Sequence, residues 1–107
     1  MELEQYAIVL VNLDPTVGSE IKKTRPCVIV SPNEMNDHLR TVVVAPMTTR
    51  SKPYPTRIEV NHNHQTGWVV IDQIRTIDKR RIIKVLGKLT AREVSYCKAI
   101  LKETFVD

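Results

Sequence analysis

Short apolar runs separated by polar segments make up most of this chain. In residues 5–13 apolar side chains occupy both faces of an extended backbone, with Ile8 and Leu10 on one face and Val9 and Val11 on the other. A strand that is apolar on both faces lies in the centre of a sheet or closes a barrel. We therefore expect a buried strand at 5–13.

The apolar runs that follow predict further strands. The β-branched run at 41–46 is the clearest strand signal, because such side chains pack well on a pleated surface. Ser31-Pro32-Asn33 ends the run before it, and residues 33–38 suit a short loop or a single helical turn. The other predicted strands are 26–31, 56–60, 68–71 and 82–89, with a turn at 61–67 and a shorter turn at 78–81.

The last part of the chain has the pattern of an amphipathic helix. Thr90 and Glu93 form a capping box, in which each side chain bonds the backbone amide of the other residue. Apolar residues then recur at helical spacing on one face, at Val94, Cys97, Ile100 and Leu101. The predicted fold is mainly β. We expect a single domain over residues 1–107, built as a small, strongly bent antiparallel barrel with a C-terminal α-helix, because closure removes exposed strand edges.

Composition limits the class of protein without naming a partner. The 107 residues suffice for one domain, and 16 Lys and Arg against 12 Asp and Glu give a net charge of +4. That excess permits binding to nucleic acid but does not establish it. No apolar run is long enough to span a membrane and no signal-peptide pattern opens the chain, so we expect a soluble cytoplasmic protein. Cys27 and Cys97 lie in apolar runs and are expected to be buried free thiols.

Two polar loops hold the residues that are able to do chemistry. The first, at 14–24, is longer than a hairpin needs, and long loops on rigid scaffolds often carry function. Pro26 biases Arg25 toward an extended backbone, so Arg25 should lie where this loop re-enters the sheet. The second polar loop, at 47–55, combines hydroxyl groups, cations and one aromatic side chain.

Together the loops present cations, hydroxyls and stacking faces. Arginine binds phosphate through two parallel hydrogen bonds, hydroxyls donate to phosphate oxygens, and aromatic rings stack on unpaired bases. The competing interpretation is a solvated polar rim with a Glu20–Arg25 surface pair, which composition alone favours. The set comprises Lys22, Lys23, Arg25, Thr48, Thr49, Arg50 and Lys52, with Glu20 beside it and Tyr54 and Trp68 as possible stacking faces.

The sequence predicts neither a metal site nor a cofactor site. His38, His62 and His64 all fall in predicted loops, and no cysteine or carboxylate pair is spaced to complete a ligand set with them. We interpret them as surface-loop residues. Phosphate-binding, dinucleotide-binding and serine-nucleophile motifs are also missing from the sequence.

Three segments carry a recognisable pattern that spans most of the chain from Leu13 to Leu89. They are Leu13-Asp14-Pro15-x-x-Gly18-x-Glu20 with Arg25-Pro26-x-Val28-Ile29-Val30-Ser31, then Val44-Ala45-Pro46-Met47-Thr48-Thr49, and then Asp72-Gln73-Ile74-Arg75-Thr76-Ile77-Asp78-Lys79-x-Arg81. In order and spacing they resemble the MazF/PemK family of toxin endoribonucleases. The resemblance implies an SH3-like barrel of the CcdB/PemK type with a C-terminal helix, which agrees with the elements predicted above.

The resemblance also assigns roles to individual residues. Arg25 and Thr48 match the catalytic arginine and threonine of the family, and Glu20 matches a loop acid that is the candidate base. Two positions depart from the family pattern. Tyr6-Ala7 stand where many members carry Gly-Asp or Gly-Glu, and Thr24 stands where some carry a histidine. The expected RNA-binding residues are Lys22, Lys23, Thr49, Arg50, Lys52, Tyr54, Gln73 and Arg75.

The function implied is cleavage of single-stranded RNA at short sequences without a metal. Attack of the substrate's own 2′-OH on the adjacent phosphate would leave a 2′,3′-cyclic phosphate and a 5′-OH. The resemblance further implies a homodimer and a co-expressed MazE-like antitoxin protein that inhibits it. Two alternatives remain: a CcdB-like DNA gyrase poison, and a non-catalytic barrel that binds single-stranded nucleic acid. Incubation with a long RNA distinguishes them.

Overall fold

The computed structural model describes residues 2–13, 24–62 and 64–106. Within these residues the chain forms seven strands, two α-helices and two short 3₁₀ helices. The strands are β1 (Ala7–Asn12), β2 (Thr24–Ile29), β3 (Thr41–Thr48), β4 (Arg57–His62), β5 (Gln65–Val70), β6 (Arg75–Asp78) and β7 (Ile82–Lys88). The helices are α1 (Asn33–His38), α2 (Ala91–Phe105), η1 (Ile71–Gln73) and η2 (Lys79–Arg81).

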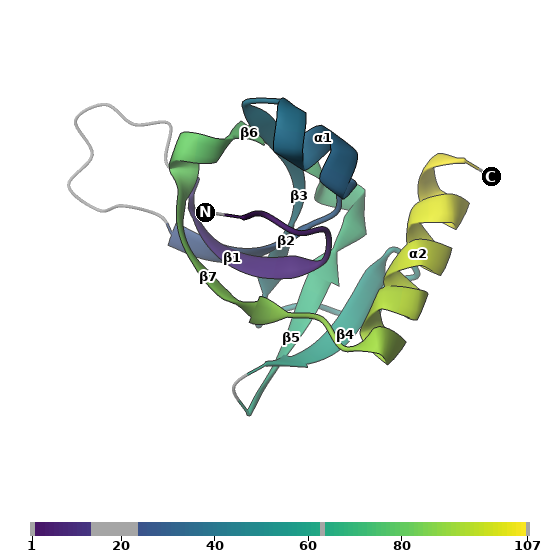
Figure 1. The fold of residues 1–107 in the computed structure, drawn as a ribbon. Coiled ribbons are helices and arrows are strands. Elements are labelled where there is room, and N and C mark those ends of the chain that lie inside the picture. Colours follow the sequence, from purple (N-terminus) through teal and green to yellow (C-terminus); the bar gives the residue numbers. More distant parts are fainter. Residues whose placement is uncertain (1, 14–23, 63, 107) are drawn as a thin grey trace.

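The strands form one curled antiparallel sheet in the order β4-β5-β3-β2-β1-β7. Strand β3 organises it, since β3 pairs with β2 along one edge and with both β5 and β6 along the other. Figure 1 shows the sheet curled around its own interior, with α1 at one end and α2 outside the curl beside β4. This mainly β arrangement with a C-terminal helix is the fold class predicted from the sequence.

Strand β1 buries both of its faces, as its sequence predicts. Ile8 packs into one core cluster with Val28, Val60, Val69, Ile71 and Cys97, against which α2 lies. Val9 and Val11 pack into a second cluster with Ile29, Val44 and Ile77. The curl of the sheet therefore places one cluster inside the barrel and the other between the sheet and α2, and β1 contributes to both.

The capping box at the start of α2 is confirmed. The Glu93 amide donates to Thr90 Oγ1 at 3.2 Å, and the Thr90 amide donates to Glu93 Oε1 at 2.9 Å. Glu93 Oε2 also accepts a hydrogen bond from the Asn61 amide at 3.0 Å, so the helix start fixes the end of β4. Cys27 and Cys97 are buried free thiols, as expected.

Several element boundaries differ from those predicted, because pairing to a neighbouring strand extends each element past its apolar run. Strand β2 begins at Thr24 rather than 26, so Arg25 is a strand residue opposite Val11. Strand β3 continues to Thr48. The turn predicted at 61–67 is wrong, since β4 and β5 remain paired as far as His62 and Gln65. Residues 33–38 form a complete short helix.

Candidate functional site

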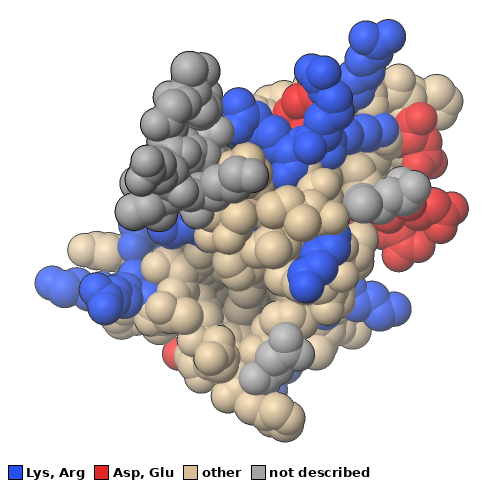
Figure 2. All heavy atoms as spheres, turned by 90° about the vertical axis from the view of Figure 1, so that its left-hand side faces the viewer, with Lys and Arg blue, Asp and Glu red and all other residues tan. Residues whose placement is uncertain are grey.

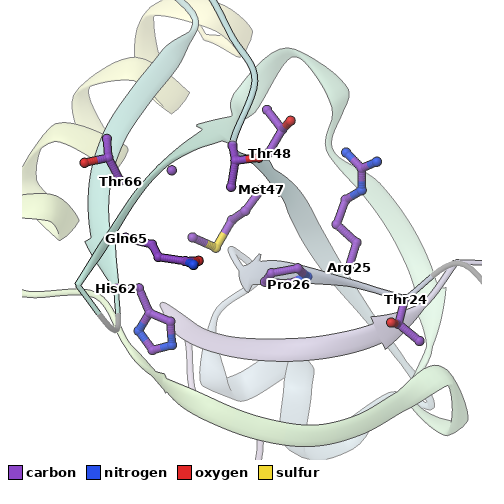
Figure 3. Close-up of a pocket in the computed structure, with 10 residues that line it drawn as sticks. Thr24, Arg25, Pro26, Met47, Thr48, His62, Gln65 and Thr66 are labelled. Atoms are coloured by element: carbon purple, nitrogen blue, oxygen red, sulfur yellow. The ribbon is translucent and has the colours of Figure 1, made fainter.

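A pocket of about 270 Å³ opens where the ends of β2 and β3 face the β4–β5 hairpin (Figure 3). Both walls are made by paired strands, so the pocket is held by backbone hydrogen bonds rather than by loop conformation. Its lining residues are Thr24, Arg25, Pro26, Met47, Thr48, Thr49, His62, Gln65, Thr66 and Gly67.

Arg25 and Thr48 lie at the ends of two adjacent strands. Strands β2 and β3 pair with Cys27 opposite Pro46 and Val28 opposite Ala45. The last pair in this register is Cys27 with Pro46, and two residues beyond it β2 carries Arg25 and β3 carries Thr48, so both side chains project from the same face of the sheet. The two residues that the family pattern marks as catalytic are therefore brought together by adjacent strand ends, and both line the pocket.

The Arg25 side chain is exposed and makes no ion pair or hydrogen bond with any residue that the structure describes. Its guanidinium extends away from the backbone of β2, at the right of the close-up (Figure 3). An arginine whose backbone is fixed in a strand and whose head group has no described partner is suited to bind an anionic ligand.

Thr48 has its hydroxyl held at the end of β3. Thr48 Oγ1 accepts a hydrogen bond from the Arg50 amide at 3.1 Å and donates to the Arg50 carbonyl oxygen at 3.2 Å. Rotation of the hydroxyl proton would free the donor for a ligand while the bond from the Arg50 amide keeps the oxygen in place. Thr49 follows at the rim of the pocket and is exposed.

Cys27 is buried in β2 two residues after Arg25, and its thiol is not reactive. Burial raises the pKa of its thiol to about 12, although the nearby Arg25 and Arg75 guanidinium groups act to lower that pKa. The thiol donates to the Arg25 carbonyl oxygen at 3.7 Å. At neutral pH Cys27 is therefore protonated and is not a nucleophile. Arg75, at the start of β6, acts on the same thiol, so the charges of Arg25 and Arg75 both lie near Cys27.

The remaining predicted site residues do not line the pocket. Arg50, Lys52, Gln73 and Arg75 are exposed. On the face drawn in Figure 2, Lys and Arg side chains surround a tan area, while most of the visible Asp and Glu lie toward one edge. Tyr54 is half exposed, but Arg57 covers one face of its ring at 4.8 Å from the centroid. Glu20, Lys22 and Lys23 lie outside the described residues.

Four pocket residues, His62, Gln65, Thr66 and Gly67, fall in the segment that was predicted as a surface turn and were not among the predicted site residues. His62, Gln65 and Gly67 lie on the inner face of the β4–β5 hairpin, which they share with Ile58 and Val60. The sequence did hold a signal, because the alternation of Ile58 and Val60 continues to His62 with the period of two that a strand requires. Within the described ranges, no three His, Cys, Asp or Glu side chains are grouped so that they could hold a metal ion.

Comparison with known proteins decides the family. Residues 4–105 match the family described as PemK-like, MazF-like toxin of type II toxin-antitoxin system. The chain belongs to this MazF/PemK toxin family. The endoribonuclease toxin MazF of Escherichia coli K12 is 32% identical to it over 93 residues, which are 86% of this chain and 84% of that protein. The endoribonuclease PemK of Escherichia coli is 38% identical over 84 residues, which are 74% of this chain and 63% of that protein.

Solved MazF structures share the fold. A MazE–MazF crystal structure from Deinococcus radiodurans matches with a TM-score of 0.83 and 25% identity, covering 97% of this chain and 96% of that one. An endoribonuclease in complex with its cognate antitoxin, from a mycobacterial species, matches with a TM-score of 0.80 and 25% identity, covering 94% and 91%. No helix in the described part of this MazF/PemK chain is long and apolar enough to cross a bilayer.

Proposed function

We propose that this chain is a sequence-specific, metal-independent endoribonuclease that cleaves single-stranded RNA, including mRNA, and acts as the toxin of a toxin–antitoxin pair. The main support for this proposal is the composition of the pocket. Arg25, which has no ion-pair partner among the described residues, lines it together with Thr48, in a chain of the MazF/PemK family. Relatives at 32% and 38% identity are named endoribonucleases, which supports the same activity here.

The proposed reaction is an internal transesterification. The 2′-OH of the nucleotide on the 5′ side of the cut attacks the phosphorus, a bond from the 2′ oxygen to phosphorus forms, and the bond to the 5′ oxygen breaks. The products are a 2′,3′-cyclic phosphate and a 5′-OH, so neither water nor a cofactor takes part in the cut. The enzyme must hold the phosphate in line, stabilise negative charge on it and move one proton at each end.

The pocket residues are suited to the charge-stabilising part of this reaction. An arginine is too weak an acid to give up its proton, so we assign Arg25 to the negative charge that develops on the phosphate oxygens and to a hydrogen bond to the leaving 5′ oxygen. The Thr48 hydroxyl donates to a non-bridging oxygen. Glu20 is the proposed base toward the 2′-OH, and the proton that it accepts balances the one that the 5′ oxygen gains. The proposed contacts to the rest of the RNA come from Thr49, Arg50, Lys52, Tyr54, Gln73 and Arg75, together with Lys22 and Lys23.

The proposal includes two protein partners. One is a second copy of the chain in a homodimer, with the RNA in a groove that crosses the interface. The other is an antitoxin of the MazE type, in line with solved relatives that are described as MazE–MazF and as an endoribonuclease with its cognate antitoxin. Since the chain carries a net charge of +4, an inhibiting segment should be acidic and should compete with RNA.

One RNA substrate tests the chemistry. A single 2′-deoxy nucleotide on the 5′ side of the cut should leave binding intact and prevent cleavage, because the nucleophile is gone. The unmodified RNA should be cut equally well in excess EDTA, and the products should carry the cyclic phosphate and the 5′-OH.

Gel mobility measures binding, and mass spectrometry identifies the product ends. Cleavage of the deoxy substrate, or loss of cleavage in EDTA, would withdraw the proposed mechanism. A long RNA that is bound but never cut would favour the non-catalytic binding barrel instead.

A further inference from the structure

The pocket has a second wall that the proposed phosphate chemistry does not use. Arg25, Thr48 and Thr49 occupy one side, whereas His62, Gln65 and Gly67 of the β4–β5 hairpin occupy the other. Figure 3 shows the Gln65 amide pointing into the space between the walls, while the Thr66 side chain points away from it. The Thr66 hydroxyl donates a hydrogen bond to Asn61 Oδ1 at 3.0 Å on the outer face of the hairpin.

His62 is the unusual member of this wall. Its Nε2 atom is buried and has no hydrogen-bond partner among the described residues. A buried polar atom without a partner is rare and carries a free-energy penalty, so its presence calls for an explanation. Rotation by half a turn about the Cβ–Cγ bond exchanges ring nitrogens for ring carbons, so the imidazole can present a nitrogen on either side of its ring.

Two glycines make room for this wall. A Cβ atom at Gly87 would lie 3.0 Å from His62 Cε1, so the imidazole would have to move away from β7 by a few tenths of an ångström to make room for it. A Cβ at Gly67 would lie 3.6 Å from the Thr48 carbonyl oxygen and 3.9 Å from Met47 Cε, which are ordinary contacts. A larger side chain at Gly67 would therefore extend into the pocket itself rather than clash with the strands.

The space between the walls has an apolar floor. Met47 is buried and Pro26 is half-buried below it, and both line the pocket. A flat heteroaromatic ring packs well on such a floor, since thioether sulfur and aromatic rings attract one another. The Gln65 amide offers both donors and an acceptor, and within the described chain it makes no side-chain hydrogen bond.

We propose that the β4–β5 side of the pocket is a nucleobase subsite, in which His62 and Gln65 determine the base that is accepted beside the scissile phosphate. This inference rests on the proposed RNA cleavage for its biological meaning. The base lies on Met47 and Pro26, its polar edge meets His62 and Gln65, and Gly67 and Gly87 provide the room. The phosphate of the same nucleotide then reaches Arg25 and Thr48.

Binding can be tested without any cleavage. The chain has three histidines, so their imidazole Cε1–H signals are few in an NMR spectrum. The four ribonucleoside 3′-monophosphates are titrated separately into the wild-type protein, with inorganic phosphate as the probe that lacks a base. The His62 signal should shift with one or two of the four nucleotides, and Gly67→Leu should abolish that shift. The His38 signal, from exposed helix α1, serves as the reference.

Cleavage mapping tests the same subsite in turnover. On a long RNA, His62→Ala should reduce the preference for the favoured base at one position beside the cut by about tenfold, the effect of losing one good polar contact. Gly87→Ala should change the same preference by displacing the ring while every side chain of the wall remains. His64→Asn is the matched control, because His64 lies two residues along the hairpin, is exposed and has a positive φ of 62° that Asn tolerates.

The outcomes separate this inference from the proposed function. If the wild type cuts no RNA, the proposed function fails, and the nucleotide titrations still decide the subsite. If the wild type cuts but His62 responds equally to all four nucleotides and to inorganic phosphate, the subsite is wrong. The subsite is also wrong if His62→Ala and Gly87→Ala fold and cut RNA at the same sequence motif as the wild type. It is equally wrong if these variants lose the same fraction of cleavage at every site, because that result indicates a general effect on catalysis.

Discussion

Two regions of this molecule contain an arginine beside a threonine, and they differ in what satisfies those side chains. Arg57 donates to Ser51 Oγ at 2.8 Å, pairs with Asp72 at 3.4 Å and covers the Tyr54 ring at 4.8 Å. Thr56 Oγ1 donates to the same carboxylate of Asp72 at 2.8 Å. We call this group the Arg57 cluster.

In the pocket, an arginine and a threonine have fewer partners than in the Arg57 cluster. Arg25 has no partner within the described ranges, and the hydroxyl of Thr48 bonds only to the backbone of Arg50. Internally paired polar groups stabilise the conformation that they link, whereas polar groups that remain free are available to a ligand. The Arg57 cluster therefore holds the segment between β3 and β4 in place, and the pocket is the region prepared for binding.

The largest difference between the two regions should appear when each arginine is replaced by alanine. Arg25→Ala should lower RNA cleavage by about a thousandfold or more, as for other arginines that neutralise phosphoryl charge. Its free energy of unfolding should change by less than about 0.5 kcal/mol, because an exposed side chain without described partners is lost. Single-turnover cleavage and urea denaturation measure the two quantities.

Arg57→Ala provides the matched control and should show the reverse. It removes a cation–π contact and hydrogen bonds, so the free energy of unfolding should fall by about 1–2 kcal/mol. Most of the cleavage activity should remain. Equal losses of cleavage in the two variants would mean that the two regions are not functionally distinct.

A smaller difference should separate the two threonines. Thr48→Val should reduce cleavage by about a hundredfold, the usual effect of losing one hydrogen-bond donor to a developing oxyanion. Thr56→Val should leave cleavage unchanged and lower the free energy of unfolding by about 1 kcal/mol, because Asp72 loses one donor. If cleavage by Thr48→Val equals that of the wild type, the role proposed for the Thr48 hydroxyl is wrong.

The smallest effect should appear in the pH dependence of stability. Burial acts to raise the pKa of Asp72, but hydrogen bonds from Thr56 and Arg57 outweigh it and hold that pKa below its ordinary value. A depressed folded-state pKa stabilises the protein fully above the unfolded value of about 3.9, and this contribution is lost as pH falls through the folded value. The side chain is 34% exposed, so the contribution should stay below about 1 kcal/mol.

Asp72→Asn makes this contribution measurable. Thermal melting should show the wild type more stable than Asp72→Asn at pH 7, with the difference shrinking as pH falls below about 4. A stability difference that persists undiminished at the lowest pH would show that Asp72 acts through packing or neutral hydrogen bonds instead of its charge.

Local features of the fold were readable from the sequence because their causes are local. The alternation in β1 marked both faces as buried, and the two core clusters contain those faces. The spacing of Thr90 and Glu93 specified the start of α2. Arg25 and Thr48 were named from a family pattern, and in the structure both line the same pocket. Their proposed roles in cleavage remain predictions.

The tertiary structure decided which side chains meet. Nothing local to Thr24 or Thr48 shows that pairing extends β2 and β3 into segments predicted as loops, because those backbone bonds go to other strands. Likewise the sequence places His62 in a polar segment, and only the curl of the sheet brings the β4–β5 hairpin across from β2. Periodicity determines the face on which a residue lies. The residue on the opposite wall depends on contacts between distant segments, which a pattern within one segment does not record.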